Sequence, residues 1–493
     1  MIAQSTAGFL AQSLTLTAMV HVALVLAIAI RVIMKRPATG VALAWLLLVT
    51  AVPFVGAGLY VLMGERRIGG RRARELGTLR GDMRRLSESL VRHGGGEVDF
   101  LPHGPAAAGL DRLGRSIAGT AAIAGSEFEL LSEPADILRA IAADIDAAET
   151  SVLMEFYIWN EGGDADLVVE ALKRAAARGV HCHVLVDALG GRPWWKGRQP
   201  AGMKAAGVDV MPALPVGLWR ALFGRTDLRL HRKIVVVDGR VGWTGSMNLV
   251  DPRFFKQDAG VGEWVDAMVR LEGRAVTLLA ATVLGDWAME VDDPVDQLLH
   301  RTKLGLAAPK GDTDMQVIAS GPGETGDGLL LMLLSLINAA HEELILTTPY
   351  FVPDEALLRS LRGAAGRGVK VVLVLPERID SFLSRHASRT YYDELIDMGV
   401  EIRLYRDGLL HTKSITVDGA LAMFGTANLD MRSLWLNFEV SLFVYDPDFT
   451  GKLRALQQRY VAASDRLDAE TWARRPFHER LVDNTLRLVS PLL

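Results

Sequence analysis

Two segments that lie far apart in the chain repeat one set of polar residues at the same spacing, and these residues are the candidates for chemistry. The first segment contains His231, Lys233, Asp238, Ser246 and Asn248. The second contains His411, Lys413, Asp418, Thr426 and Asn428. One such pattern is weak evidence, but two copies that share the tail Gly-Ser/Thr-x-Asn at one offset indicate a duplicated functional site.

Each segment is predicted to form a β-hairpin. The apolar run after each lysine is a strand, Asp-Gly is the turn, and the run that leads to Gly-Ser or Gly-Thr is the return strand. Residues two apart on a strand point the same way, so each histidine shares a face with its lysine. One imidazole, one ammonium and one amide per hairpin suit a phosphodiester. The lysine and asparagine hold non-bridging oxygens, and the histidine does covalent or proton chemistry.

These paired segments resemble the H-K-D motifs of the phospholipase D superfamily. Their wider contexts, residues 245–252 and 425–433, resemble its bacterial cardiolipin synthase branch. The likeness runs through both halves and includes the N-terminal apolar segments. It implies an α/β fold of two duplicated phospholipase D-like sandwich domains with one shared central site, preceded by two N-terminal transmembrane helices.

The resemblance also implies roles for the motif residues. One histidine attacks phosphorus and forms a phosphohistidine, while the other protonates the leaving alcohol and deprotonates the incoming one. We assign His231 as the nucleophile and His411 as the acid/base, although the residues alone leave this order open. Phosphate contacts are expected from Lys233, Lys413, Ser246, Asn248, Thr426 and Asn428.

Two further pairs of carboxylates belong to the predicted site. Asp238 and Asp418 are part of the motif, but Asp-Gly is good turn chemistry by itself, so a structural role is favoured over direct catalysis. A nucleophilic histidine needs an acceptor on its far nitrogen. Asp266 and Glu439 stand where the family carries such a carboxylate, which implies that they orient the two histidines.

No metal or other cofactor is expected. The run His181-Cys182-His183 invites a metal site, but successive strand residues point to opposite faces and cannot bind one ion together. No other spacing suggests zinc, and a two-histidine mechanism needs no metal. The single cysteine excludes an internal disulfide, and the net charge of −4 provides no general basic field for nucleic acid.

Strands and helices are predicted to alternate in the same order in both halves. The predicted elements are strand 151–159, helix 164–178 and strand 180–187, and then strand 343–350, helix 354–367 and strand 369–375. The alternation favours an α/β layer fold, and the recurrence favours an internal duplication.

Two long uncharged runs, Phe9–Ile30 and Val41–Met63, precede the rest of the chain. Each is long enough to cross a bilayer of about 30 Å as a helix. No basic residue precedes the first run and a second run follows at once, which disfavours a cleaved signal peptide. Pro53, Gly56 and Gly58 interrupt the second run, so a kinked or re-entrant segment is the alternative to a true span.

Basic and aromatic residues suggest how the chain meets a membrane. Arginines cluster after the second run, at positions 66, 67, 71, 72 and 74, and the positive-inside rule then places the C-terminal part in the cytoplasm. The same cluster would attract anionic lipid head groups. Segments 193–196 and 218–223 mix aromatics with cations as interfacial segments do, and core packing explains them equally well.

Composition and the repeated pattern divide the chain into six segments. We expect a membrane region at 1–64 with helices about 9–34 and 41–63, a basic linker at 65–130, phospholipase D-like domain 1 at 131–292, a linker at 293–313, phospholipase D-like domain 2 at 314–470, and a C-terminal helix at 471–493 that docks on the catalytic core. Prolines and glycines at the second linker mark the boundary between domains.

The leading hypothesis for function is transfer of a phosphatidyl group between two phosphatidylglycerol molecules, which gives cardiolipin and glycerol. The expected location is the bacterial inner membrane, as a multi-pass protein with its catalytic domains on the cytoplasmic side. A homo-oligomer is left open. The motifs do not separate this activity from a hydrolytic phospholipase D or from transfer that uses phosphatidylethanolamine. The membrane segments disfavour a nuclease, and two complete motifs disfavour an inactive scaffold.

Overall fold

The computed structural model describes residues 2–37, 39–64, 70–92, 96–217, 225, 227–291, 295–322 and 327–487. The chain forms two units, residues 1–69 with 216–227, and residues 70–215 with 228–493. The larger unit contains both histidine motifs. The predicted interfacial segment 218–223 and the arginines at 66 and 67 lie outside the described residues.

The smaller unit contains three apolar helices, α1 (Ile2–Lys35), α2 (Thr39–Ala51) and α3 (Val55–Met63). Thr15–Lys35 in α1 is a stretch of 21 residues, and it is the one part of the described chain that is long and apolar enough to cross a membrane. It falls where the sequence predicts the first span.

The prediction of a second span over 41–63 is wrong. The run divides into α2, of 13 residues, and α3, of 9 residues. At 1.5 Å per residue, neither reaches the roughly 30 Å of a bilayer core. The break falls at Pro53, which has no N–H for the preceding turn, and Phe54 beside it has a φ of 60°. Hydropathy is continuous through this run, but the helical backbone is not.

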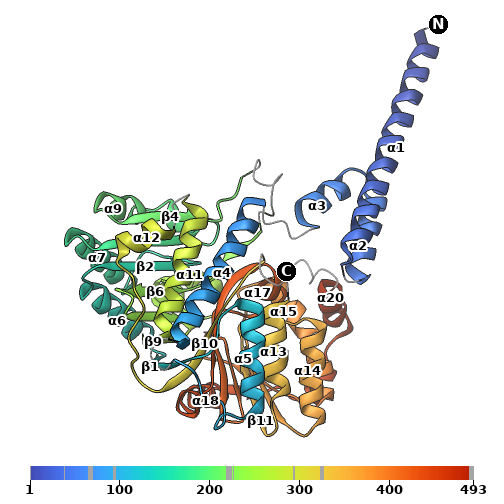
Figure 1. Ribbon diagram of the computed structural model, residues 1–493. Coiled ribbons are helices and arrows are strands. Elements are labelled where there is room, and N and C mark those ends of the chain that lie inside the picture. The colour runs from blue at the N-terminus through green and yellow to red at the C-terminus, as the bar shows by residue number, and fades with distance from the viewer. Residues whose placement is uncertain are drawn as a thin grey trace. The chain divides into compact units, whose positions relative to one another are not determined.

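Both halves of the larger unit contribute strands to one mixed sheet (Figure 1). From the edge of the first half to the centre, the order is β4 (Asp209–Ala213), β3 (His181–Asp187), β2 (Ser151–Phe156), β6 (Ile234–Val237), β7 (Val241–Gly245), β9 (Met268–Gly273) and β1 (Ile123–Leu131). From the centre to the edge of the second half, it is β10 (Thr313–Ser320), β19 (Asn437–Val444), β17 (Leu421–Gly425), β16 (Ser414–Val417), β11 (Glu343–Thr347), β13 (Lys370–Pro376), β14 (Glu401–Tyr405) and β20 (Ser464–Arg466). The two halves meet where β1 pairs antiparallel with β10, so duplicated domains share one sheet instead of forming two separate sandwiches.

The strand–helix–strand units predicted in each half are confirmed. Helix α7 (Ala165–Ala177) connects β2 to β3, and α14 (Glu355–Gly366) connects β11 to β13. The strands of each unit pair in parallel. A parallel pair needs such a crossover, because a tight turn cannot return the chain to the same end of the sheet.

Helices pack on the sheet in equivalent places in the two halves (Figure 1). Helix α6 (Pro134–Asp146) lies beside α7, and α13 (Gly328–Asn338) lies beside α14, each over a continuous apolar core. Helix α11 (Ala275–Glu290) contacts β2, β6, β7 and β9, and α18 (Pro447–Ala462) contacts β11, β16 and β17. The motif strands are therefore enclosed within a layered core.

Much of the segment predicted as a basic linker, 65–130, is folded. Helix α4 (Gly70–Arg92) packs against α11, α5 (Gly104–Ala118) packs against α13, and β1 is a central strand. In α5, Ala107, Leu110 and Ile117 are buried in the core of the second half. The spacing of these apolar residues is helical, but the many arginines and glycines of the segment conceal it.

The remaining elements are short. They are α8 (Arg192–Trp195), α9 (Gln199–Ala205), α12 (Val295–Thr302), α15 (Phe382–Arg389), α16 (Tyr392–Asp397), α17 (Met431–Trp435), α19 (Ala469–Ala473) and α20 (Phe477–Arg487), the 3-10 helices η1 (Pro252–Phe254) and η2 (Gln257–Ala259), and strands β5 (Arg229–Leu230), β8 (Trp264–Val265), β12 (Phe351–Val352), β15 (Leu409–Leu410) and β18 (Leu429–Asp430).

Two of these short elements bear on predictions made from the sequence. In α8, Trp194 is buried and stacks on Trp159 with ring centroids 5.0 Å apart, so this residue of segment 193–196 is part of the core, whereas Pro193 and Lys196 are exposed. Helix α20 docks on α15, where His386 Nδ1 lies 2.6 Å from Asp483 Oδ1. This agrees with the predicted docking of the C-terminal helix, whose last residues, 488–493, lie outside the described residues.

Candidate active site

Both predicted hairpins are present at equivalent places in the sheet. Strand β6 pairs antiparallel with β7, and β16 pairs antiparallel with β17. Asp238 and Asp418 open the turns with φ of 51° and 50°, and Gly239 and Gly419 follow with φ of 63° and 66°. Two consecutive residues with positive φ thus form each Asp-Gly turn, and because Val237 pairs with Val241 and Val417 with Leu421, each hairpin loop has three residues.

The turn aspartates tie each hairpin to the strand beside it. Asp238 accepts hydrogen bonds from the backbone amides of residues 149, 150 and 151 at 2.8–2.9 Å, and from Thr150 Oγ1 at 2.7 Å. Asp418 accepts from the amides of residues 341–343 at 2.8–2.9 Å. Burial raises the pKa of Asp238, but these hydrogen bonds outweigh burial and leave its pKa below the ordinary value. Both carboxylates are thus engaged in structural contacts.

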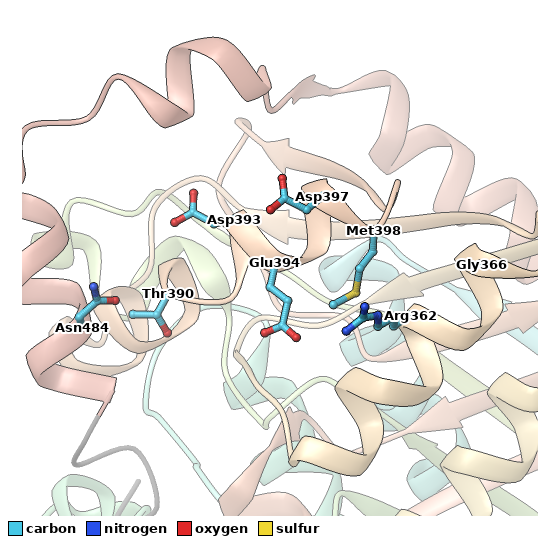
Figure 2. A pocket seen from close by; sticks show the side chains of 8 residues that line it. All are labelled: Arg362, Gly366, Thr390, Asp393, Glu394, Asp397, Met398 and Asn484. Carbon is cyan, nitrogen blue, oxygen red and sulfur yellow. The ribbon is translucent and has the colours of Figure 1, made fainter.

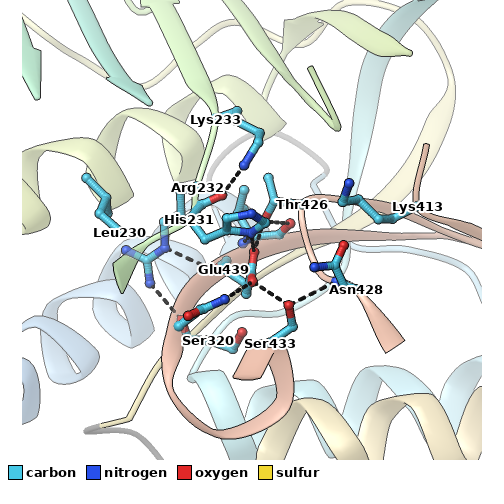
Figure 3. A network of polar contacts seen from close by, with 12 residues as sticks. Leu230, His231, Arg232, Lys233, Ser320, Lys413, Thr426, Asn428, Ser433 and Glu439 are labelled. Atoms are coloured by element: carbon cyan, nitrogen blue, oxygen red, sulfur yellow. Dashed lines mark hydrogen bonds and ion pairs between the residues drawn. The ribbon is translucent and has the colours of Figure 1, made fainter. Parts of the chain in front are cut away.

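Each motif histidine is held by a carboxylate from the opposite half of the chain. His231 Nδ1 donates to Glu439 Oε2 at 2.8 Å (Figure 3). His411 Nδ1 donates to Asp266 Oδ1 at 2.7 Å. The sequence predicts both carboxylates as orienting groups but not which histidine each one holds. The crossed pairing means that neither half contains a complete site.

Two short parallel strand pairs produce the crossing. Strand β5, just before His231, pairs with β19, and the His231 amide donates to the carbonyl of Phe438 at 2.9 Å. Strand β15, just before His411, pairs with β8, and the His411 amide donates to the carbonyl of Val265 at 2.8 Å. In both cases the residue after the accepting carbonyl is the orienting carboxylate. Backbone register therefore places each carboxylate beside its imidazole.

The hydroxyls expected to contact phosphate support the orienting carboxylates instead. Ser246 Oγ donates to Asp266 Oδ1 and Thr426 Oγ1 donates to Glu439 Oε2, both at 2.6 Å. These are the same oxygens that accept from the histidines, and both hydroxyl residues are fully buried. Ser433 Oγ donates to the other oxygen of Glu439 at 2.7 Å (Figure 3). Glu439 therefore accepts through both oxygens, whereas Asp266 accepts from His411 and Ser246 through Oδ1 alone. These donors fix each carboxylate and with it the imidazole that it holds.

Both motif lysines are buried beside the histidines. Lys233 is 0% exposed and Lys413 is 1% exposed, and each donates from Nζ to the carbonyl of its own motif histidine. Burial lowers the pKa of Lys233 to about 8 and that of Lys413 to about 7, against the opposing pull of Glu439 and Asp266. Each lysine also lowers the pKa of the histidine in the other half. The two motifs therefore lie within range of one another's charges.

The electrostatics leave both imidazoles neutral at neutral pH. Burial lowers the pKa of His231 and of His411 to about 4, although the orienting carboxylates pull in the other direction. Since each Nδ1 carries the proton that it donates to a carboxylate, Nε2 has the lone pair. A neutral imidazole in this tautomer can attack phosphorus or accept a proton at Nε2.

The motif asparagines are buried and differ in their hydrogen bonds. Asn248 Oδ1 accepts from the amide of Ile158 at 3.1 Å, and its Nδ2 has no hydrogen-bond partner among the described residues. Asn428 Nδ2 donates to Asp430 Oδ2 at 3.0 Å. A buried donor without a partner is costly unless a ligand completes it. The Asn248 amide is therefore available to a phosphate oxygen.

Several side chains around the imidazoles belong to no motif. The Tyr157 ring lies 5.0 Å from that of His231, and the Trp264 ring lies 4.3 Å from that of His411. Asp187 Oδ2 accepts from the amide of Leu230 at 3.0 Å and so holds β5 in place. Tyr157 and Asp187 lie in or next to strand runs that read as core, and the sequence gives no sign of their roles. For Trp264, the one feature of the sequence that could have pointed to the site is its position two residues before Asp266.

An acidic pocket in the second half is separate from this site (Figure 2). Its lining includes Asp393, Glu394 and Asp397 together with Arg362, and it contains none of the motif residues. Within the described ranges, no group of three His, Cys, Asp or Glu side chains is arranged to hold a metal ion. The groups suited to phosphodiester chemistry are those of the crossed histidine site.

Comparisons with known proteins give matches to the N-terminal apolar region and to both halves of the larger unit. A family model described as cardiolipin synthase, phospholipase D-like domain matches residues 141–261 and 333–460, and one described as phospholipase D-nuclease N-terminal matches residues 23–65. Cardiolipin synthase A of Erwinia tasmaniensis is 42% identical over 477 residues, which cover 95% of this chain and 96% of that protein. Cardiolipin synthase A of Edwardsiella ictaluri is 41% identical over 483 residues, with the same coverage.

Among solved structures, the phosphatidylserine synthase of Haemophilus influenzae has a similar fold. It superposes with a TM-score of 0.57 at 15% sequence identity, and the match covers 74% of this chain and 95% of that one. At this identity the likeness concerns the fold alone. It agrees with the two duplicated halves of the larger unit.

Proposed function

We propose, since this chain belongs to the cardiolipin synthase family of phospholipase D-like proteins, that it transfers the phosphatidyl group of one phosphatidylglycerol to the head group of a second. The products are cardiolipin and free glycerol. One observation carries the proposal. Two imidazoles, each oriented by a carboxylate from the opposite half, lie within range of the charges of both buried lysines.

In the first step, Nε2 of His231 attacks the phosphorus of the bound donor lipid. The bond from phosphorus to the glycerol oxygen breaks as the phosphorus–nitrogen bond forms, and His411 gives a proton to the departing glycerol. The pKa of His411 is about 4 without substrate. A bound phosphodiester brings a negative charge next to the ring and favours its protonated form. On binding of the donor lipid, His411 thus takes up a proton from solvent at Nε2 and becomes the acid that the step needs.

In the second step, His411 removes a proton from a glycerol hydroxyl of the second lipid. The oxygen attacks phosphorus, the phosphorus–nitrogen bond breaks, and His231 is released. Lys233 and Lys413 offset the negative charge on the non-bridging oxygens, and Asn248 donates a hydrogen bond to one of them. A site that excludes water favours attack by the lipid alcohol over hydrolysis.

The protein is anchored, in this proposal, in the bacterial cytoplasmic membrane through α1, with the catalytic halves on the cytoplasmic side. The apolar stretch Thr15–Lys35 supports the anchor, and the arginine-rich sequence at 66–74 supports the orientation. Residues 131–292 and 314–470 are the two duplicated domains of this scheme. Each contains one of the segments matched by the family model, 141–261 and 333–460.

Purified full-length protein in detergent with phosphatidylglycerol tests the proposal. Cardiolipin and glycerol should form in equal amounts, and His231→Asn should form neither. Phosphatidic acid as the sole lipid product would identify a hydrolase instead. Cardiolipin that forms only after phosphatidylethanolamine is added, with release of ethanolamine and no glycerol, would identify that lipid as the donor.

A further inference from the structure

A chain of polar and aromatic contacts joins the two halves beside His411. Lys256 Nζ donates to Asp380 Oδ2 at 2.8 Å, and Tyr350 Oη donates to Asp380 Oδ1 at 2.6 Å. The Lys256 ammonium also lies 5.2 Å from the centre of the Trp264 ring, which is the ring 4.3 Å from that of His411. The steps proposed above use neither the ion pair nor the phenol.

The position of Lys256 is more closely defined than that of an ordinary surface lysine. The Asp380 side chain is 7% exposed and that of Lys256 is 43% exposed. The Lys256 backbone has a φ of 50°, in the left-handed region that side chains other than glycine adopt at a cost. Its ammonium lies 5.5 Å from the centre of the Phe255 ring as well. A buried carboxylate and two aromatic rings thus hold one cation in place.

These residues lie on the side of the site where the alcohol reacts. The proposed mechanism brings the departing glycerol, and then the incoming one, to His411. Burial raises the pKa of the Asp380 carboxyl, but Lys256, Tyr350 and, more weakly, His411 lower it below its ordinary value. Tyr350 lies within electrostatic range of Tyr157, whose ring contacts His231. The contacts place the chain beside His411, through the Trp264 ring that lies next to both Lys256 and His411.

The side chains in this chain of contacts are suited to binding a neutral polyol. The Lys256 ammonium can donate to a hydroxyl oxygen, the Asp380 carboxylate and the Tyr350 phenol can accept from hydroxyls, and Trp264 offers a face for carbon–hydrogen groups. An ethanolamine head group carries an ammonium in place of hydroxyls. An unpaired carboxylate would attract it, but Lys256 already neutralises Asp380 and repels a second cation.

We infer that Lys256, Asp380 and Tyr350 form the subsite for the alcohol, and that the ion pair selects glycerol over ethanolamine head groups. This inference rests on the proposed function. In the first step, glycerol in this subsite takes the proton of His411 as its bond to phosphorus breaks. In the second, the glycerol hydroxyl of the acceptor lipid occupies the same subsite and loses its proton to His411 as the new bond to phosphorus forms and the bond to His231 breaks.

Competition between two donor lipids tests the inference. Full-length protein in mixed micelles receives phosphatidylglycerol and phosphatidylethanolamine at equal mole fractions, with each head group labelled, and released glycerol and ethanolamine are counted. The wild type should release glycerol in excess. Lys256→Met should raise the ratio of ethanolamine to glycerol by about tenfold or more, because it uncovers a buried carboxylate beside the bound cation.

Three further variants serve as controls. Lys256→Arg keeps the charge and should keep the wild-type ratio. The double variant Lys256→Met/Asp380→Asn has no carboxylate to uncover and should lose the gain in ethanolamine release. Lys452→Met is the matched control, because Lys452 also pairs with an aspartate at 2.8 Å and lies 4.6 Å from an aromatic ring centre, but on α18. Its rate and ratio should not change.

An unchanged ratio in an active Lys256→Met variant would overturn the subsite, and so would a gain that persists in the double variant. If Lys256→Met is inactive, Lys256→Arg decides. Activity with the wild-type ratio would support a requirement for the charge, whereas a folded but inactive arginine variant would overturn it. A wild type that forms no cardiolipin from phosphatidylglycerol would overturn the proposed function instead, so the two failures are distinguishable.

Discussion

Replacement of Lys413 by methionine should stabilise the protein while it abolishes turnover. The lysine is 1% exposed, and burial lowers its pKa from the ordinary 10.5 to about 7. Since one pKa unit corresponds to about 1.4 kcal/mol, the charged ammonium costs up to about 5 kcal/mol of folding free energy below pH 7. Methionine has a similar shape and no charge, so it removes this cost together with the charge that would hold the phosphate.

The stability gained by Lys413→Met should decrease as the pH rises. Because the native pKa of Lys413 lies below its unfolded value, the unfolded chain binds more protons between about pH 7 and pH 10.5. Wild-type stability therefore rises with pH across this window. The advantage of the methionine variant should be largest at pH 7 or below, about 2 kcal/mol at pH 9, and lost near pH 10.5.

Urea unfolding of the full-length protein in detergent, followed by tryptophan fluorescence at pH 7 and pH 9, measures this effect. Lys452→Met is the control, because Lys452 pairs with Asp448 on the surface with side chains 55% and 67% exposed. It should change stability by less than about 1 kcal/mol. A Lys413→Met variant that is less stable than the wild type at pH 7, or equally shifted at both pH values, would refute the reasoning. Retained turnover would refute the role assigned to the charge.

Further expectations follow from the same contacts. Glu439→Gln removes the charge that orients His231 and should lower cardiolipin formation by roughly 10²–10⁴-fold in a folded protein, and Thr426→Val, which loses only a hydroxyl that holds Glu439, should cost about tenfold. Asp238→Ala leaves the part-buried backbone amides of residues 150 and 151 without their acceptor, so urea unfolding should show a loss of about 1–3 kcal/mol while turnover of the folded fraction changes little. Between pH 6.5 and about 4 the unfolded chain protonates His231 and His411 before the native state does, so stability should fall as pH falls, and His411→Asn should flatten that slope.

The hairpins could be read from sequence because their determinants are local. Strand alternation and Asp-Gly turn chemistry act over a few residues, and the structure has both turns where the sequence places them. The pairing of each histidine with a carboxylate from the opposite half is determined by contacts between distant parts of the chain. His231 and Glu439 are separated by 208 positions, and His411 and Asp266 by 145. Only the pairing of β5 with β19 and of β15 with β8 decides which carboxylate meets which histidine.

The errors of the sequence prediction have physical causes. Hydropathy reports burial or membrane contact but not the continuity of a helix, so it predicts the run 41–63 as a span although Pro53, which the sequence also marks as an interruption, divides it into two helices. Charge-rich composition hid α5, whose apolar stripe packs in the core of the second half. Ser246 and Thr426 have hydroxyls suited either to phosphate or to carboxylate. Only the fold shows that they donate to Asp266 and Glu439.

Capture of the covalent intermediate tests the crossed two-histidine site most directly, because the mechanism requires His231 to carry the phosphatidyl group. Full-length protein is mixed with phosphatidylglycerol, quenched in denaturant at neutral pH, where the phosphorus–nitrogen bond is not exposed to acid, and mapped by mass spectrometry. The phosphatidyl adduct should lie on His231 and should be absent from His231→Asn. An adduct on His411 alone, or cardiolipin formation with no histidine adduct at any time, would contradict the mechanism.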